Sequence, residues 1–129
     1  MIQSFRDLEV WRKSMDLAER VYFASKDFPQ SEIFGLTSQV RRAAVSIPSH
    51  IAEGKAVGGQ RYRRHVKIAL GSNAELQTQI ELAKRLNMLT EAAGDELLQQ
   101  ATEIGRMLAG LFRALPKAYL ILQPFTGPA

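Results

Sequence analysis

The amino-acid sequence predicts an all-α protein, an antiparallel four-helix bundle whose helices run up, down, up and down. The first observation is a helical period, with apolar residues spaced by three and four along nearly the whole chain. The second is that helix breakers divide this period into four long segments with short connections, which favours antiparallel neighbours. The third is the length of 129 residues, which suits one domain with its own core. Residues 1–129 are therefore expected to form a single domain.

The first helix is predicted over residues 7–28, and its main apolar row comprises Leu8, Trp11, Met15, Ala18 and Tyr22. Pro29 ends this helix, because proline lacks the amide proton and clashes with the preceding turn. The second helix is predicted over residues 31–56, with Ser31 as its N-cap. Its apolar row comprises Ile33, Leu36, Val40, Ala43, Ile47 and Ile51.

The glycine pair at residues 58–59 separates the second helix from the third, which is predicted over residues 60–88. The seam of the third helix comprises Tyr62, Val66, Ala69, Asn73, Leu76, Ile80 and Ala83. The fourth helix is predicted over residues 91–115, with Thr90 as its cap. Residues 116–129 contain two further prolines and a glycine after Pro116, and we expect a short, loosely attached tail there.

The stretch RRAAVSIPSHIAEG, residues 41–54, places a proline inside the second helix. Pro48 removes one backbone donor, and its ring clashes with the carbonyl four residues earlier. Because the apolar spacing resumes in phase at Ile51, we expect a kink near residues 44–48 and not two separate helices. The kink either lets the helix wrap the core or aims its basic end toward one surface.

The positive charge of the chain is local. The formal net charge is +4 and the isoelectric point is near 9.7. Residues 41–67 contain seven basic residues and one acid, Glu53, so this segment carries +6 and the rest of the chain −2. A local excess of positive charge is what an anionic partner would meet.

The composition also bears on the cellular setting. The chain has no cysteine, which excludes disulfides and thiolate metal sites and fits a reducing compartment. Its first residues lack the charged and apolar regions of a secretory signal, and no stretch approaches the roughly 20 apolar residues of a membrane span. We expect a cytoplasmic protein without a membrane partner.

Motifs for enzymatic chemistry are missing from the sequence. There is no nucleophile elbow and no phosphate-binding loop of the Walker type. His50 and Glu53 stand three residues apart on one helix face, a spacing compatible with metal ligation. Di-metal bundles, however, repeat a Glu-x-x-His motif on two helices. Here the order is reversed and no second copy exists. We therefore predict no metal, no cofactor and no catalytic residues.

A polar row interrupts the apolar pattern of the third helix. Ser72, Glu75 and Gln79 follow the spacing of one helix face. An unpaired buried carboxylate is costly, so Glu75 is expected to find a cationic partner, with Arg41 or Arg42 as the natural candidates. This row either fixes helix register or subunit pairing, or binds a ligand or nucleic acid, or is simply exposed to solvent.

Basic residues crowd the end of the second helix, the glycine loop and the start of the third helix. The candidate nucleic-acid-binding residues are Lys55, Arg61, Arg63, Arg64 and Lys67, together with Arg41 and Arg42. Positive charge at a helix N-terminus opposes the helix dipole, so these residues gain nothing locally. The alternatives are a solvated charged face and a surface for the phosphates of RNA or DNA, on which Tyr62 could stack a base.

Three stretches of the chain resemble one known family. FRDLEVWRKSMDL, LTSQVRRAAVSIPSHIAEG and YRRHVKIALGSNAELQTQIELA resemble the four-helix-bundle proteins encoded by intervening sequences of bacterial 23S ribosomal RNA genes, over residues 5 to about 115. The chain is also similar to the accessory variability determinants of diversity-generating retroelements. For those relatives the resemblance implies a homopentameric barrel with a positive surface, nucleic-acid binding and association with a reverse transcriptase.

The resemblance also assigns residues to motifs. In the second helix the family pattern falls on Arg41, Arg42, Ser46, Pro48, Ile51, Ala52, Glu53 and Gly54, and in the third on Ser72, Glu75, Thr78 and Gln79. Glu53 thereby joins Ser72, Glu75 and Gln79 as a candidate for a buried or interface polar layer. The family usually carries Asn where this chain has His50.

Two functional hypotheses follow. The first is a non-enzymatic homo-oligomer that binds RNA or DNA through the phosphates, with little sequence preference. The second is an assembly or adaptor protein whose partner is another protein, such as a reverse transcriptase. The second hypothesis predicts apolar side chains left outside the core, and Trp11, Tyr22 and Phe34 are the candidates.

Overall fold

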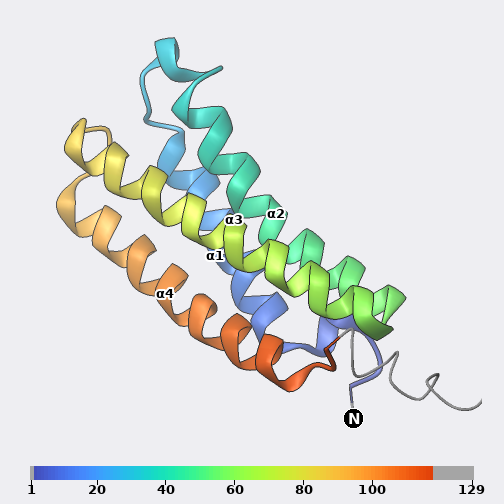
Figure 1. The fold of residues 1–129 in the computed structure, drawn as a ribbon. Coiled ribbons are helices and arrows are strands. Elements are labelled where there is room, and N and C mark those ends of the chain that lie inside the picture. The colour runs from blue at the N-terminus through green and yellow to red at the C-terminus, as the bar shows by residue number, and fades with distance from the viewer. Residues whose placement is uncertain (1, 118–129) are drawn as a thin grey trace, which may run out of the picture.

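The computed structural model describes residues 2–117, and all of its regular structure is helical (Figure 1). A short 3-10 helix, η1 (Phe5–Asp7), precedes α1 (Glu9–Ser25), and a second, η2 (Gln30–Glu32), precedes α2 (Leu36–Val57). The chain continues through α3 (Gly59–Arg85) and α4 (Glu91–Ala114). The predicted all-α class with four long helices is confirmed. The tail prediction for residues 118–129 lies outside the described residues.

The helices pack in chain order and close into a bundle. Each helix contacts the next one, α1 also contacts α4, and the contact between α2 and α3 is the most extensive. In Figure 1 the chain reverses direction at each connection, so that consecutive helices lie alongside each other. The largest fully buried side chains come from all four helices and include Leu17, Ile47, Ile51, Leu76, Ile80, Ile104 and Leu108.

The start of the second helix differs from the prediction. The N-cap assigned to Ser31 is wrong, because Ser31 lies in η2 and α2 begins five residues later, at Leu36. The Glu32 carboxylate performs the capping from a distance: its Oε1 accepts a hydrogen bond from the amide of Leu36 at 3.0 Å. Ile33, placed in the apolar row by its spacing, precedes α2 and is partly exposed.

The cap of the fourth helix agrees with the prediction, since the Thr90 hydroxyl accepts a hydrogen bond from the amide of Ala93 at 3.1 Å. α2 is helical without interruption from Leu36 to Val57, with Pro48 buried inside it. The kink at Pro48 stays a prediction.

A single residue, Gly58, connects α2 to α3. Its φ is +68° and that of Gly59 is +61°, in the region that side chains with a Cβ atom rarely adopt. This tight turn fixes how the end of α2 faces the start of α3, which is where most of the predicted site residues lie.

Candidate nucleic-acid interface

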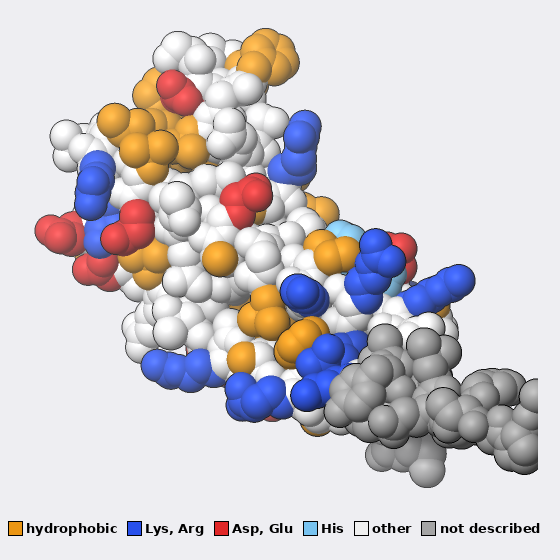
Figure 2. Space-filling view, in the orientation of Figure 1, with side chains coloured by type: hydrophobic (Ala, Val, Ile, Leu, Met, Phe, Trp, Pro, Cys, Tyr) orange, Lys and Arg blue, Asp and Glu red, His pale blue; other side chains and the backbone are white. Residues whose placement is uncertain are grey.

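Three basic side chains form an exposed row at the start of α3. Arg61, Arg64 and Lys67 are all exposed, and their spacing of three residues places them on one side of the helix. Figure 2 shows Lys and Arg side chains gathered over this end of the bundle, around the histidines. None of the three forms an ion pair within residues 2–117. We call Arg61, Arg64 and Lys67 the basic row.

Several basic residues elsewhere in the bundle are paired with acids. Lys13 bridges from α1 to Glu103 on α4, and Arg20 bridges in the same way to Glu96. Lys84, near the end of α3, contacts Asp95 on α4. These pairs lie between helices, whereas the basic row gathers three exposed cations without an ion pair on one face of α3.

Arg63 differs from its neighbours in the basic row. Its side chain is half-buried, and its Nε donates a hydrogen bond to the carbonyl of Phe112 at 3.2 Å. Its guanidinium carbon lies 3.7 Å from the centroid of the Phe112 ring, a cation–π contact. Arg63 therefore ties the start of α3 to the end of α4, and its guanidinium is occupied within the protein.

Replacement of Arg63 by Gln is expected to lower the free energy of unfolding by about 1 kcal/mol, because both the hydrogen bond and the cation–π contact are lost. Urea denaturation followed by circular dichroism measures this loss. Arg64→Gln, one residue along and exposed, is the matched control and should change stability by less than about 0.5 kcal/mol. Equal stabilities of the two variants would remove the structural role assigned to Arg63.

Lys55 and Tyr62 lie at the edge of the basic row. Lys55 is half-buried, and its Nζ lies 6.0 Å from the centroid of the Tyr62 ring. Tyr62 packs against the core, and this burial raises the pKa of its phenol above the ordinary value. Its ring is thus largely used in packing, and Lys55 contributes positive charge beside it.

Arg41 and Arg42 lie toward the opposite end of α2. Arg42 precedes Lys55 by 13 residues, which is about 20 Å along the helix axis. The Nε of Arg41 donates to the Ser25 hydroxyl at 2.8 Å, and its guanidinium lies 4.7 Å from the Tyr22 ring centroid. The charged segment that is continuous in sequence is therefore divided in space, and the basic row stands without these two arginines.

The predicted polar layer is only partly buried. Gln79 is buried, Ser72 is half-buried, and Glu53 and Glu75 are exposed. The Ser72 hydroxyl forms a 2.7 Å hydrogen bond with that of Ser46, which joins α3 to α2.

The partner expected for Glu75 is not Arg41, which is engaged by α1. Gln79 donates to the Glu75 carboxylate at 3.3 Å. Arg42 lines the same shallow groove of about 500 Å³ as Glu75 without forming an ion pair with it in the described part of the chain.

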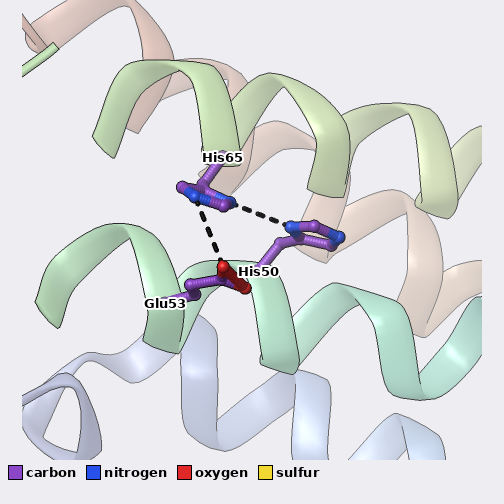
Figure 3. A group of neighbouring side chains, drawn as sticks. All are labelled: His50, Glu53 and His65. Carbon is purple, nitrogen blue, oxygen red and sulfur yellow. Dashed lines mark hydrogen bonds and ion pairs between the residues drawn. The ribbon is translucent and has the colours of Figure 1, made fainter. Parts of the chain in front are cut away.

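Two polar features were not predicted from the sequence. Asn73, which the periodicity placed in the apolar seam, is buried and donates to the carbonyl of Ala101 on α4 at 3.1 Å. His65 joins His50 and Glu53 in one cluster across α2 and α3 (Figure 3). The two histidines lie at nearly equal distances in sequence from the turn, because His50 is eight residues before Gly58 and His65 seven after it. This near symmetry would have predicted that they face each other.

Absence of a side chain at Gly54 lets this cluster form. A Cβ atom there would lie 2.8 Å from the Cβ of His65 and 3.1 Å from a ring carbon of Tyr62. The start of α3 therefore approaches α2 closely at this point, and His65 is held against the turn of α2 that carries His50 and Glu53.

Within residues 2–117, no helix is both long and apolar enough to cross a lipid bilayer. Fold and site together define a small four-helix-bundle protein with a tight glycine turn and an uncompensated basic row beside it. The chain belongs to the 23S rRNA-intervening sequence protein family, whose sequence model matches residues 6–110.

A solved structure has the same fold. It is the crystal structure of a protein of unknown function from the S23 ribosomal protein family of Bacteroides thetaiotaomicron, with a TM-score of 0.76 and 23% sequence identity. The similarity covers 81% of this chain and 99% of that one. No protein with a curated description matches the chain significantly.

Proposed function

We propose that this protein is a non-enzymatic, homo-oligomeric binder of RNA or DNA. The observation that carries the proposal is the basic row, three exposed cations on one face of α3 without acidic partners in the described structure. Lys55 adds a fourth positive charge at its edge. Long, flexible cations of this kind contact phosphate oxygens and release condensed counterions from the nucleic acid.

The contacts are expected to be made with the backbone of the nucleic acid. Arginine and lysine on phosphates set affinity and register but carry no information about sequence. The one aromatic ring among these cations, Tyr62, is packed against the core, which leaves little of it for stacking on a base. Binding should therefore depend strongly on salt and weakly on sequence.

Self-association would multiply the charge of one chain. A groove of about 1220 Å³ runs along α1, α2 and α4 and includes exposed or half-buried apolar side chains of Trp11, Met15, Tyr22, Phe23 and Val45. We place the contact between copies of this chain on that groove, because the basic row lies on α3, outside its lining. A ring of copies would then present several basic rows to one polyanion.

A salt titration tests this proposal. Fluorescent single-stranded RNA and DNA are titrated with protein whose mass has been fixed by light scattering, at several salt concentrations. A multimeric mass and a steep fall of log affinity with log salt are the expected results. Failure to bind either nucleic acid at low salt would reject the proposal and leave the basic row as a solvated face.

Protein assembly is the second candidate function, and exposed aromatic side chains favour it. Phe34 is 95% exposed and Phe23 74%, while Tyr22 is 43% exposed. Trp11 is half-buried and lies against the Phe5 ring, with the ring centroids 5.3 Å apart, so it is the least available of the predicted residues. Exposed phenyl rings are typical of partner surfaces.

A co-purification experiment separates the two candidates. The wild-type protein and a Phe34→Ser variant, whose side chain lies outside the groove proposed for self-association, are isolated under identical conditions from lysate with and without nuclease treatment. An adaptor would retain a stoichiometric protein partner only in the wild-type form. If both forms recover nucleic acid in equal amounts from untreated lysate, and neither recovers a protein partner, the adaptor function is eliminated.

A further inference from the structure

We propose that His50, Glu53 and His65 form a binding site for a divalent transition-metal cation, and that zinc suits it best. His50 and Glu53 stand three residues apart on α2, and His65 faces them from the start of α3 (Figure 3). Nucleic-acid binding neither requires this site nor is required by it.

The distances between the candidate ligand atoms approach those of a coordination shell. The Nδ1 atoms of His50 and His65 are 3.0 Å apart, and the ligand atoms of all three residues lie within 4.8 Å of one another. Zinc bonds of about 2.0–2.2 Å place neighbouring tetrahedral ligands roughly 3.4 Å apart. The imidazoles need to part by a few tenths of an ångström, and the 59% exposed Glu53 side chain is free to rotate inward.

Only one of the two facing Nδ1 atoms of His50 and His65 can carry a proton when no cation is bound. Their rings stack with centroids 5.2 Å apart, and their Nδ1 atoms face each other, so one must donate and the other accept. A cation can use both Nδ1 lone pairs at once, with the protons on the Nε2 atoms. The Glu53 carboxylate, which lies 3.7 Å from the Nε2 of His65 when no ion is bound, then leaves this atom and turns toward the ion.

The ligand set selects the class of cation. Two imidazole nitrogens and one carboxylate suit zinc and its first-row neighbours, whereas magnesium and calcium require mainly oxygen ligands. Both histidines are half-buried, which leaves a path from solvent and a fourth position for water. Arg61 and Arg64 on the same end of α3 repel a cation, so we expect micromolar affinity and not that of a closed structural site.

The location gives the site a mechanical effect. Its ligands come from both sides of the Gly58 turn, so that a bound ion would join the last turns of α2 to the first turns of α3. An ion that binds only the folded state raises its stability according to the affinity and the free ion concentration. The melting temperature should therefore rise with zinc.

Calorimetric titration of the full chain with zinc chloride, in the absence of any polyhistidine tag, tests the site. We expect one zinc per chain, an affinity at least about tenfold lower for His50→Asn and for His65→Gln, and a smaller loss for Glu53→Gln. Glu19→Gln, an exposed carboxylate on α1, is the matched control and should bind zinc as the wild type does. Circular dichroism of each variant verifies that the helices remain.

Nuclear magnetic resonance distinguishes zinc bound by the two histidines from zinc bound elsewhere on the protein surface. The chain has only two histidines, so both imidazoles can be followed in nitrogen-15 spectra. Zinc should shift both Nδ1 resonances together and leave both Nε2 atoms protonated. The proposal is overturned if no heat of binding is detected, or if zinc shifts the resonances of only one histidine. It is also overturned if zinc increases the molecular mass of the particle in solution, because two chains would then share the ion.

Discussion

Simultaneous replacement of Arg61, Arg64 and Lys67 by Gln is expected to reduce the affinity for RNA and DNA about 100-fold near 0.1 M salt. Counterion release contributes nearly tenfold for each phosphate contact at that salt, and the three cations supply up to three contacts per chain. The slope of log affinity against log salt should become shallower by up to about 2.7 for a duplex. Fluorescence anisotropy at four salt concentrations measures both quantities.

The matched control removes three positive charges from the other end of the bundle. Lys26, Arg42 and Arg85 are exposed and lie near the end of α1, the start of α2 and the end of α3. Their replacement by Gln changes the net charge equally but should leave the salt slope unchanged. If both triple variants lose affinity to the same extent, binding responds to total charge, and the basic row is not its site.

Replacement of Gly54 by Ala is expected to lower the free energy of unfolding by about 2 kcal/mol. The new methyl group would lie 2.8 Å from the Cβ of His65 and 3.3 Å from the carbonyl oxygen of Tyr62, and neither atom belongs to a flexible side-chain end. Separating α2 from α3 at their most extensive contact costs more than the helix propensity that alanine gains. Thermal and urea unfolding measure the difference.

Gly71→Ala is the internal comparison for that variant. Gly71 lies in the middle of α3, and nothing stands within 4 Å of the position its Cβ would occupy. With propensity as the only effect, this variant should be more stable than the wild type by about 0.5–1 kcal/mol. A Gly54→Ala protein as stable as Gly71→Ala would contradict the close approach of the two helices.

The long helices could be predicted because burial follows the helical period of the apolar residues along the sequence. Ile47, Leu76 and Ile80 belong to rows identified by spacing, and all three are fully buried. The start of α2 could not be predicted in the same way. Ser31 has the right residue type for a cap, but the amide of Leu36 is capped by the carboxylate of Glu32 from outside the helix.

The candidate site, too, contains residues that local spacing predicts and residues that depend on contacts distant in sequence. Exposure of Arg61, Arg64 and Lys67 follows from their spacing against the apolar seam of α3. The partial burial of Arg63 depends on its contact with Phe112, nearly 50 residues away, and no local sequence pattern predicts that contact. The Gly58 turn could have paired His50 with His65, but only once its length was known to be a single residue.

The single-residue turn at Gly58 also limits how the length of this chain can change. Because α2 and α3 are paired outward from that turn, one residue inserted between Val66 and Ser72 would rotate the rest of α3 by about 100°. The Ser46–Ser72 hydrogen bond and every later contact would be lost, while Gly54 and His65 would keep theirs. We therefore expect insertions to be tolerated better between α1 and α2, or between Leu86 and Thr90, at the end of the bundle opposite the basic row, than within α2 or α3.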